Sequence, residues 1–206
     1  MLIVGKAGTG KTFRILQRVE SALRSGQAGE VCLVTPTSSM ARHLAHELAR
    51  KGLAVPGSVV IPIKKLIEKL TPDVREPSPA VDSWLLEEAL TQSASTTFGA
   101  LTSSPGLLRR AKTAIDELQS AGCSPDQARN LARSSQQKAL AEAYKTYQGF
   151  LDTFELSSAP QRRTAAAQEA ALHGLPGIEK VFFDGFWSFS PSEIDLVRSL
   201  RNRGHE

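Results

Sequence analysis

The segment from Gly5 to Thr12 constrains the fold of this 206-residue chain more than any other feature. It fits the pattern Gly-x-x-x-x-Gly-Lys-Ser/Thr at every fixed position. The sequence predicts the strand and the helix that such a loop needs, at residues 1–4 and from Thr12 to Leu23. Glycines let backbone N–H groups converge on phosphate oxygens, and the helix N-terminus adds positive potential. We therefore expect a phosphate-binding loop made of Gly5, Lys6, Ala7, Gly8, Thr9, Gly10, Lys11 and Thr12.

This loop predicts ATP and Mg²⁺ as ligands. Lys11 should bridge the β- and γ-phosphates, and the Thr12 hydroxyl should bind Mg²⁺. A second metal-side acid is expected at the end of a neighbouring strand, and Asp184 follows the apolar run at 179–183. An ordinary Asp-Gly turn is the alternative for Asp184. Lys11 and Asp184 are the catalytic candidates. The next residue, Gly185, can neither accept a proton nor orient a water molecule, so the sequence predicts nucleotide binding but leaves hydrolysis open.

The order of apolar segments predicts an α/β fold. Buried strands are expected at 30–35, 59–61 and 179–183. A helix at 38–51 is expected after the first of these strands, and a helix at 64–70 after the second. Strand–helix alternation of this kind is typical of a parallel sheet. The middle of the chain shows helical patterns only. We therefore expect a first part of the core at 1–72, a helical insertion at 73–177 and a return to the core at 178–206.

Charge and composition narrow the class of partner. Residues 1–72 hold 11 Lys and Arg against 4 Asp and Glu, whereas residues 73–206 hold 14 against 17. The first third is thus a candidate for contact with phosphates, although solvated helix faces would explain the same excess. No apolar run approaches the roughly 18 residues that span a membrane, and two cysteines suit a reducing cytoplasm. Trp84 and Trp187 are expected in the core, with the alternative that Trp187 and Phe186, which follow the metal-side acid, pack on the nucleic-acid side of the site.

Two stretches near the N-terminus are similar to a known family. The loop GKAGTGKT and the later LVTPTSSMARHLAHEL resemble the opening of superfamily 1 DNA helicases of the UvrD/Rep type. The matching positions in the second stretch are Thr35, Thr37, Ser38 and Ala41. The resemblance implies a P-loop NTPase with a RecA-like parallel sheet core and a large all-helical insertion. It also implies that Thr35, Thr37 and Ser38 touch the backbone of single-stranded DNA.

The C-terminal stretch VFFDGFWSFSPSEIDLVRSL resembles AddB/RexB-type helicase–nuclease subunits more specifically. The matching residues are Asp184, Gly185, Phe186, Phe189, Pro191 and Glu193, and upstream Glu117, Leu118, Gly122 and Pro125. The resemblance implies the N-terminal fragment of a subunit that processes double-strand DNA ends for recombination. Its partners would be single-stranded DNA, a duplex end and an AddA-like subunit. No membrane partner is expected.

Residues 62–66 depart from the family pattern. Pro62 stands where the family has a hydroxyl side chain, while Lys64 and Lys65 could track a DNA backbone or form a solvated face. Gly185 takes the place of the helicase glutamate, as it does in AddB-type subunits, so helicase activity of this site is doubtful. Two other functions stay open. One is an active UvrD-like DNA-dependent ATPase, and the other is a P-loop NTPase or kinase unrelated to DNA.

Overall fold

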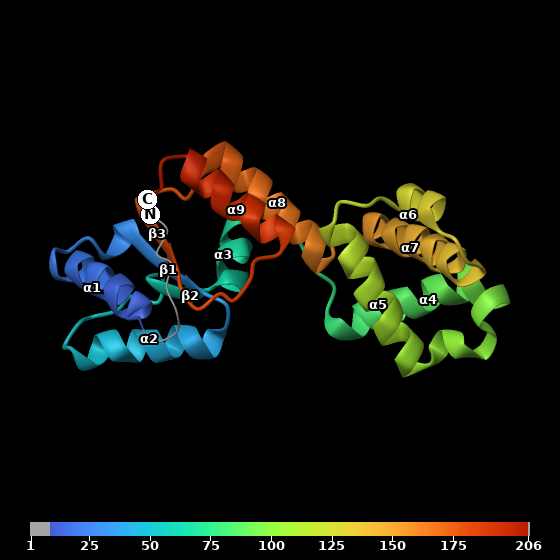
Figure 1. The fold of residues 1–206 in the computed structure, drawn as a ribbon, viewed down its shortest axis with the longest axis horizontal. Coiled ribbons are helices and arrows are strands. Elements are labelled where there is room, and N and C mark those ends of the chain that lie inside the picture. The colour runs from blue at the N-terminus through green and yellow to red at the C-terminus, as the bar shows by residue number, and fades with distance from the viewer. Residues whose placement is uncertain (1–8, 206) are drawn as a thin grey trace. The chain divides into compact units, whose positions relative to one another are not determined.

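A three-stranded parallel sheet forms from segments that lie far apart in the sequence (Figure 1). Its strands are β1 (Val31–Thr35), β2 (Val60–Pro62) and β3 (Lys180–Phe183), in the spatial order β2–β1–β3. The central strand β1 pairs Leu33 with Val60 on one side and with Phe182 on the other. The expected strands at 30–35, 59–61 and 179–183 are therefore confirmed. The strand expected at 1–4 lies outside the described residues, because the computed structural model describes residues 9–205.

The described chain divides into two compact units. Unit 1 combines the chain up to Pro72 with the chain from Ala165 onward, and unit 2 is Asp73–Thr164. The helices of unit 1 are α1 (Lys11–Arg24), α2 (Ser38–Arg50), α3 (Ile63–Leu70) and α9 (Pro191–Asn202), with a short 3₁₀ helix η1 (Ala28–Glu30). Helix α8 (Ala159–His173) contributes its residues from Ala165 onward to unit 1. Residues 165–177 therefore belong with the sheet, whereas the sequence predicts them as the end of the insertion at 73–177.

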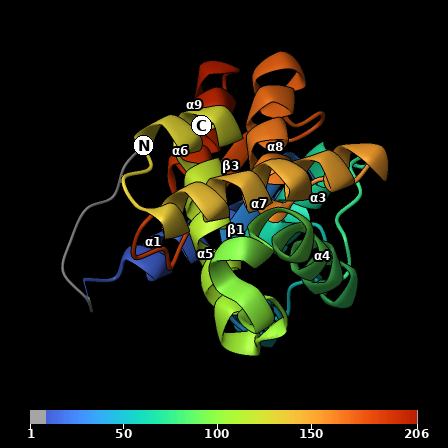
Figure 2. The ribbon, with the colours of Figure 1, turned by 90° about the vertical axis from the view of Figure 1, so that its right-hand side faces the viewer.

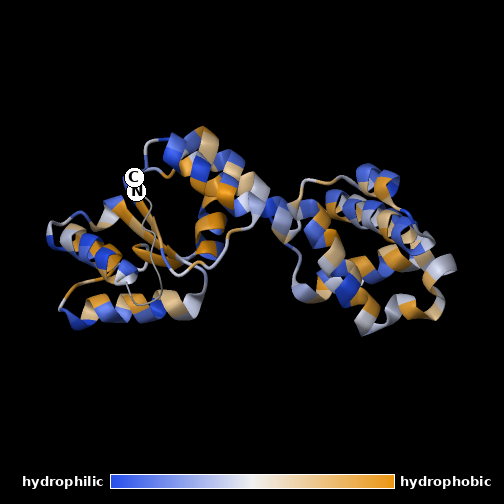
Figure 3. Cartoon of the chain, viewed as in Figure 1, coloured by the Kyte–Doolittle hydropathy of each residue, from blue (hydrophilic) through white to orange (hydrophobic). Residues whose placement is uncertain are grey.

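Helices cover both faces of the sheet because the side chains of β1 alternate between two apolar clusters. Val31 and Leu33 pack with α1 and α2, whereas Cys32 and Val34 pack with α3, α8 and α9. All five residues of β1 are buried, which fits a strand with no solvent-facing side. Figure 3 shows apolar residues on the strands and on the helix faces turned toward them.

Unit 2 is helical throughout. It contains α4 (Pro79–Phe98), η2 (Gly99–Ser103), α5 (Pro105–Ser120), α6 (Pro125–Leu131) and α7 (Ser135–Thr153). Helix α7 packs along α4 and α6, as Figures 1 and 2 show. The core is built from Leu85, Leu86 and Leu90 of α4 with Tyr147 and Leu151 of α7.

Hydroxyl caps set where the helices of unit 2 begin. The side chains of Ser78, Ser104, Ser124 and Ser134 each accept a hydrogen bond from the backbone N–H three residues later. Such caps satisfy a donor that the helix itself leaves unpaired. Within unit 2, the backbone N–H of Ser157 donates to the carbonyl of Arg75 at 2.8 Å, so the unit begins and ends at neighbouring points.

The expected RecA-like core is wrong. The described residues are mostly helical (67%), and their sheet has only three short strands. The phosphate-loop motif predicts one strand–loop–helix unit but not the number of strands in the sheet around it. The expectation of a RecA-like sheet came from the resemblance to helicases alone. A small parallel sheet with helices on both faces is what the described part of unit 1 contains. Among residues 9–205, no helix has both the length and the apolar character needed to cross a membrane.

The two cysteines provide a chemical test of this fold. Burial raises the pKa of Cys32, in the centre of the sheet, to about 11, whereas Cys123 of unit 2 is half-buried. Because the thiolate is the reactive form, we expect a maleimide at neutral pH to modify Cys123 first and Cys32 only after the sheet opens. Peptide mass spectrometry over time measures both rates, and Cys123→Ser leaves the slow thiol alone. Rapid labelling of Cys32 in the folded chain would contradict the arrangement of β1.

Candidate phosphate- and metal-binding site

Several of the predicted site residues lie at one edge of the sheet. Because all three strands are parallel, the residues after Thr35, Pro62 and Phe183 emerge at the same carboxyl edge. Ligands of parallel α/β sheets bind at this edge. The N-terminus of α1 lies there too, since Thr12 in its first turn reaches Asp184. The structure thus brings together Thr12, at the end of the phosphate-loop motif, and Asp184, the acid predicted on the metal side.

A hydrogen bond joins the two predicted metal ligands. The Thr12 hydroxyl donates to Oδ2 of Asp184 at 2.8 Å, across 172 residues of sequence. A hydroxyl has one proton to donate and two lone pairs that accept, so this bond leaves the Thr12 oxygen able to coordinate a cation. Asp184 is only 7% exposed, and its carboxylate adds negative charge beside that oxygen. The pair therefore provides oxygen ligands of the kind that Mg²⁺ prefers.

A magnesium ion bound with a nucleotide needs few protein ligands. Mg²⁺ keeps several waters and takes one or two protein oxygens together with the phosphates of its substrate. No cluster of three or more His, Cys, Asp or Glu that could hold a metal by itself occurs in residues 9–205. The two oxygens of the Thr12–Asp184 pair match the number of protein ligands that Mg²⁺ takes when phosphates and waters supply the others.

The first turn of α1 faces this pair. Gly10 precedes the helix with φ +76°, a left-handed conformation that favours glycine, and no side chain caps the helix. Lys11 is the first helical residue, and no acidic side chain lies in the first turn. Uncapped N–H groups and the helix dipole together favour an anion at this end. Of the predicted loop, Gly5, Lys6, Ala7 and Gly8 lie outside the described residues, whereas Thr9, Gly10, Lys11 and Thr12 lie inside them.

The backbone after β3 fixes the position of Asp184. Its N–H donates to the carbonyl of Val34 at 3.0 Å, which extends the pairing of β3 with β1 by one residue. Gly185 then adopts φ +82°, a conformation that a side chain rarely tolerates. A Cβ built there would also overlap Cε and Sδ of Met40. The φ of position 185 therefore favours glycine, and any side chain there would also displace the end of Met40.

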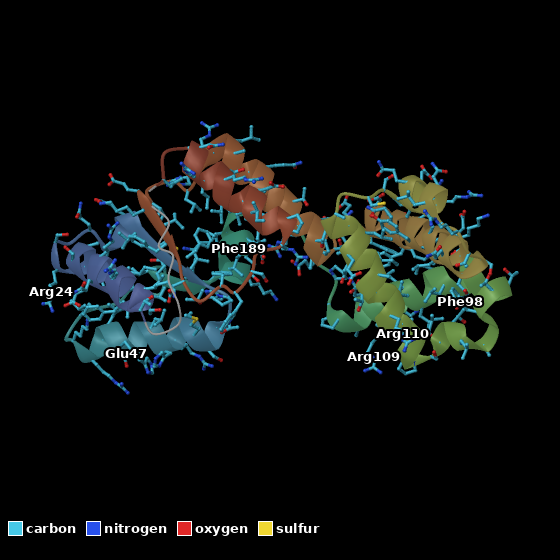
Figure 4. The ribbon with its side chains drawn as sticks, in the orientation of Figure 1. Arg24, Glu47, Phe98, Arg109, Arg110 and Phe189 are labelled. Atoms are coloured by element: carbon cyan, nitrogen blue, oxygen red, sulfur yellow. The ribbon has the colours of Figure 1, made fainter. Side chains whose placement is uncertain are left out.

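Aromatic residues hold the loop between β3 and α9. The rings of Phe186 and Phe189 stack with centroids 4.6 Å apart, and Phe183 meets Phe186 edge-on at 5.9 Å. Phe183 also meets Phe189 edge-on, with ring centroids 6.1 Å apart, and Figure 4 labels Phe189 in this loop. Trp187 lies between the two stacked phenylalanines in sequence and is 99% exposed.

The predicted burial of the two tryptophans is wrong. Trp187 is 99% exposed and Trp84 is 56% exposed. Beside Trp187, Phe186 packs against the apolar cluster of unit 1 and leaves the larger ring outside. The spacing of three aromatic residues within four positions is the signal that could have revealed it, because a short loop cannot turn all of them inward.

Glu193 is engaged in the start of α9. Its carboxylate accepts from the backbone N–H of Ser190 at 2.8 Å, and the Ser190 hydroxyl accepts from the N–H of Glu193. This capping box ties the carboxylate to the helix end. Glu193 is therefore used structurally and is not directed at the Thr12–Asp184 pair.

The residues expected to touch DNA lie in different environments. Thr35 is fully buried, and its hydroxyl donates to the carbonyl of Thr37 at 3.0 Å, so its side chain shapes the segment from inside. Thr37 is exposed and caps α2 through a hydrogen bond from the N–H of Met40 at 3.2 Å. Ser38, Lys64 and Lys65 are exposed, the lysines in the first turn of α3. Exposed polar residues thus follow both β1 and β2 at the carboxyl edge.

Neither a protein-family model nor a curated protein matches this chain. The interpretation of the site therefore depends on its own geometry and on the motifs in the sequence.

The Thr12–Asp184 hydrogen bond can be tested in the absence of any ligand. Thr12→Val keeps the shape of the side chain but removes the donor, which leaves a buried carboxylate without that partner. We expect a loss of about 1–3 kcal/mol in the free energy of unfolding, measured with urea. Thr12→Ser, which keeps the hydroxyl at similar helix propensity, is the matched control and should lose less. Equal stabilities of the two variants would show that the bond contributes nothing to the fold.

Proposed function

We propose that this chain binds Mg²⁺–ATP at the carboxyl edge of the unit 1 sheet. The observation that carries the proposal is the 2.8 Å hydrogen bond between Thr12 and Asp184, because it unites the end of a phosphate-loop motif with a strand-end acid. In this proposal Gly5 to Thr12 wrap the phosphates, Lys11 contacts the β- and γ-phosphates, and Thr12 coordinates the metal directly. Asp184 holds the metal through water.

In our proposal ATP acts mainly as a ligand whose binding changes the conformation of the chain, without rapid hydrolysis. Hydrolysis by such a site needs a carboxylate that orients the attacking water. Position 185, next to the metal-side acid, is glycine, and the carboxylate of Glu193 is committed to the capping box of α9. These two observations favour binding without rapid turnover.

We further propose that the chain is the ATP-binding part of a DNA helicase/exonuclease subunit acting in double-strand break resection and recombinational repair in the cytoplasm. The support is the resemblance of residues 181–200 to AddB/RexB-type subunits, together with the basic excess of residues 1–72. The exposed Thr37, Ser38, Lys64 and Lys65 would contact the DNA backbone. A duplex end and an AddA-like subunit would be the further partners.

Titration calorimetry of Mg²⁺–ATP into the chain tests the nucleotide site. We expect binding that Lys11→Ala weakens at least about tenfold, because the lysine charge on the phosphates is lost. Asp184→Asn should reduce the dependence of the affinity on Mg²⁺ and leave metal-free binding nearly unchanged. A phosphate-release assay on the same samples should show no rapid turnover.

The results of the nucleotide-binding and phosphate-release assays distinguish this function from the two alternatives. Phosphate release stimulated by single-stranded DNA would contradict the conformational role and indicate an active UvrD-like ATPase. Tight nucleotide binding with no affinity for DNA would indicate an NTPase or kinase unrelated to DNA. Failure of the unchanged chain to bind nucleotide would contradict the proposed site itself.

The DNA surface is tested by removing its charge. In a Trp84→Phe background Trp187 is the only tryptophan left, so its fluorescence reports on the carboxyl edge. We expect an unstructured thymidine oligonucleotide to change that fluorescence, and Lys64→Ala/Lys65→Ala to weaken its binding and reduce the salt dependence by about two ion equivalents. Arg109→Ala/Arg110→Ala removes two exposed charges from α5 of unit 2 (Figure 4) and is the matched control. Equal losses in both double variants would contradict a specific DNA surface on α3.

A further inference from the structure

Met40 lies against Gly185 at the turn that follows the metal-side acid. A Cβ built on Gly185 would overlap Cε and Sδ of Met40 and would lie 3.5 Å from Cδ of Pro36. The thioether therefore occupies the space into which any side chain at position 185 would project. Met40 is half-buried and belongs to the edge of the apolar cluster that α1 and α2 form on the sheet.

The same residue helps to build the first turn of α2. Its backbone N–H donates to the hydroxyl of Thr37 at 3.2 Å, and the N–H of Ala41 donates to the carbonyl of Thr37 at 3.0 Å. One side chain thus touches the Asp184–Gly185 turn while its own backbone forms the start of α2.

We propose that Met40 is a positioning residue that links the Asp184–Gly185 turn to the N-terminus of α2, an inference that rests on the proposed nucleotide site. Occupancy of the Thr12–Asp184 pair by Mg²⁺ and nucleotide then orders the Thr37–Ser38 end of α2. The link is a side-chain contact and is separate from the backbone hydrogen bond between the N–H of Asp184 and the carbonyl of Val34, in which Met40 takes no part.

The chemistry of methionine suits this role. Its side chain is unbranched and polarisable, so it fills an irregular space and follows small displacements of its neighbours. Glycine at position 185 offers a flat backbone surface with no side chain to hold Met40 away. A shift of the turn, as Asp184 adjusts to a hydrated metal, is therefore transmitted directly to the thioether.

The contact itself is tested without nucleotide by a double-mutant cycle. Gly185→Ala should destabilise the chain, because of its positive φ and because its methyl group meets Met40. In a Met40→Ala background the second cause disappears, and we expect the effect of Gly185→Ala on the unfolding constant to shrink by about tenfold. A Leu53→Ala background, which truncates another half-buried side chain of the same cluster, should leave that effect unchanged. An additive Met40–Gly185 cycle would overturn the contact and the proposal with it.

Transmission is tested by hydrogen exchange at the backbone amides of positions 40 and 41, with and without saturating Mg²⁺–ATP. We expect nucleotide to slow both amides by at least about fivefold in the unchanged chain and in Met40→Leu, which keeps a side chain of similar volume. Met40→Ala should still bind nucleotide, measured by calorimetry, and still slow the amides of α1, but show less than about a twofold change at positions 40 and 41.

The outcomes distinguish this inference from the proposed function. If the unchanged chain does not bind Mg²⁺–ATP, the proposed function fails and the transmission fails with it, whatever the cycle shows. If nucleotide binds and Met40→Ala retains the full response at α2, the proposed function stands and the role of Met40 is overturned. A response lost in Met40→Ala and restored in Met40→Leu supports the link, because a merely structural defect would also weaken nucleotide binding.

Discussion

The hydrogen bond between Thr12 and Asp184 depends on nearly everything else in unit 1. It joins residues 172 positions apart, so the chain must leave the sheet, form unit 2 and return before it can close. Parallel pairing makes this possible, because β3 ends at the same edge as β1 and at the start of α1. An antiparallel β3 would carry Asp184 to the opposite edge. The direction of one short strand therefore decides whether the site exists.

Unit 2 can interrupt the sheet because it has its own core and neighbouring ends. Among residues 9–205, the members of its apolar cluster lie between Leu85 and Leu156. The hydrogen bond from Ser157 to the carbonyl of Arg75 brings the start and the end of the unit together. A segment that enters and leaves at one place leaves the rest of the sheet free to pair. The alternating side chains of β1 then require apolar helices from both halves of unit 1, which is why residues from Ala165 onward pack with those before Pro72.

Local patterns predicted the elements well and their environments less well. The run at 30–35 predicted β1 because a strand buried on both faces is continuously apolar, and the Asp184–Gly185 pair was recognised from its place after such a run. The width of the sheet could not be read in this way, since it is a property of strands that pair across the chain. The inward position of Thr35 also escaped prediction, because a threonine in a strand looks alike whether its hydroxyl meets a ligand or the carbonyl of Thr37. The exposure of Trp187 depends on how Phe186 and Phe189 stack, which hydrophobicity alone does not encode.

Most polar side chains around the carboxyl edge already have a structural task, and this limits the chemistry available there. Thr37 caps α2, and Glu193 closes the capping box of α9. In our proposal the Thr12 oxygen and the Asp184 carboxylate serve the metal, and Lys11 and the lysines of α3 serve phosphates. On that proposal this set would hold phosphates and a hydrated cation, and it includes one carboxylate among the described residues, that of Asp184. Since Met40 fills the space at Gly185, a glutamate there would need both a strained backbone and a displaced methionine. On the proposed function, any carboxylate that drives hydrolysis would therefore have to come from a partner or from a segment other than the Asp184–Gly185 turn.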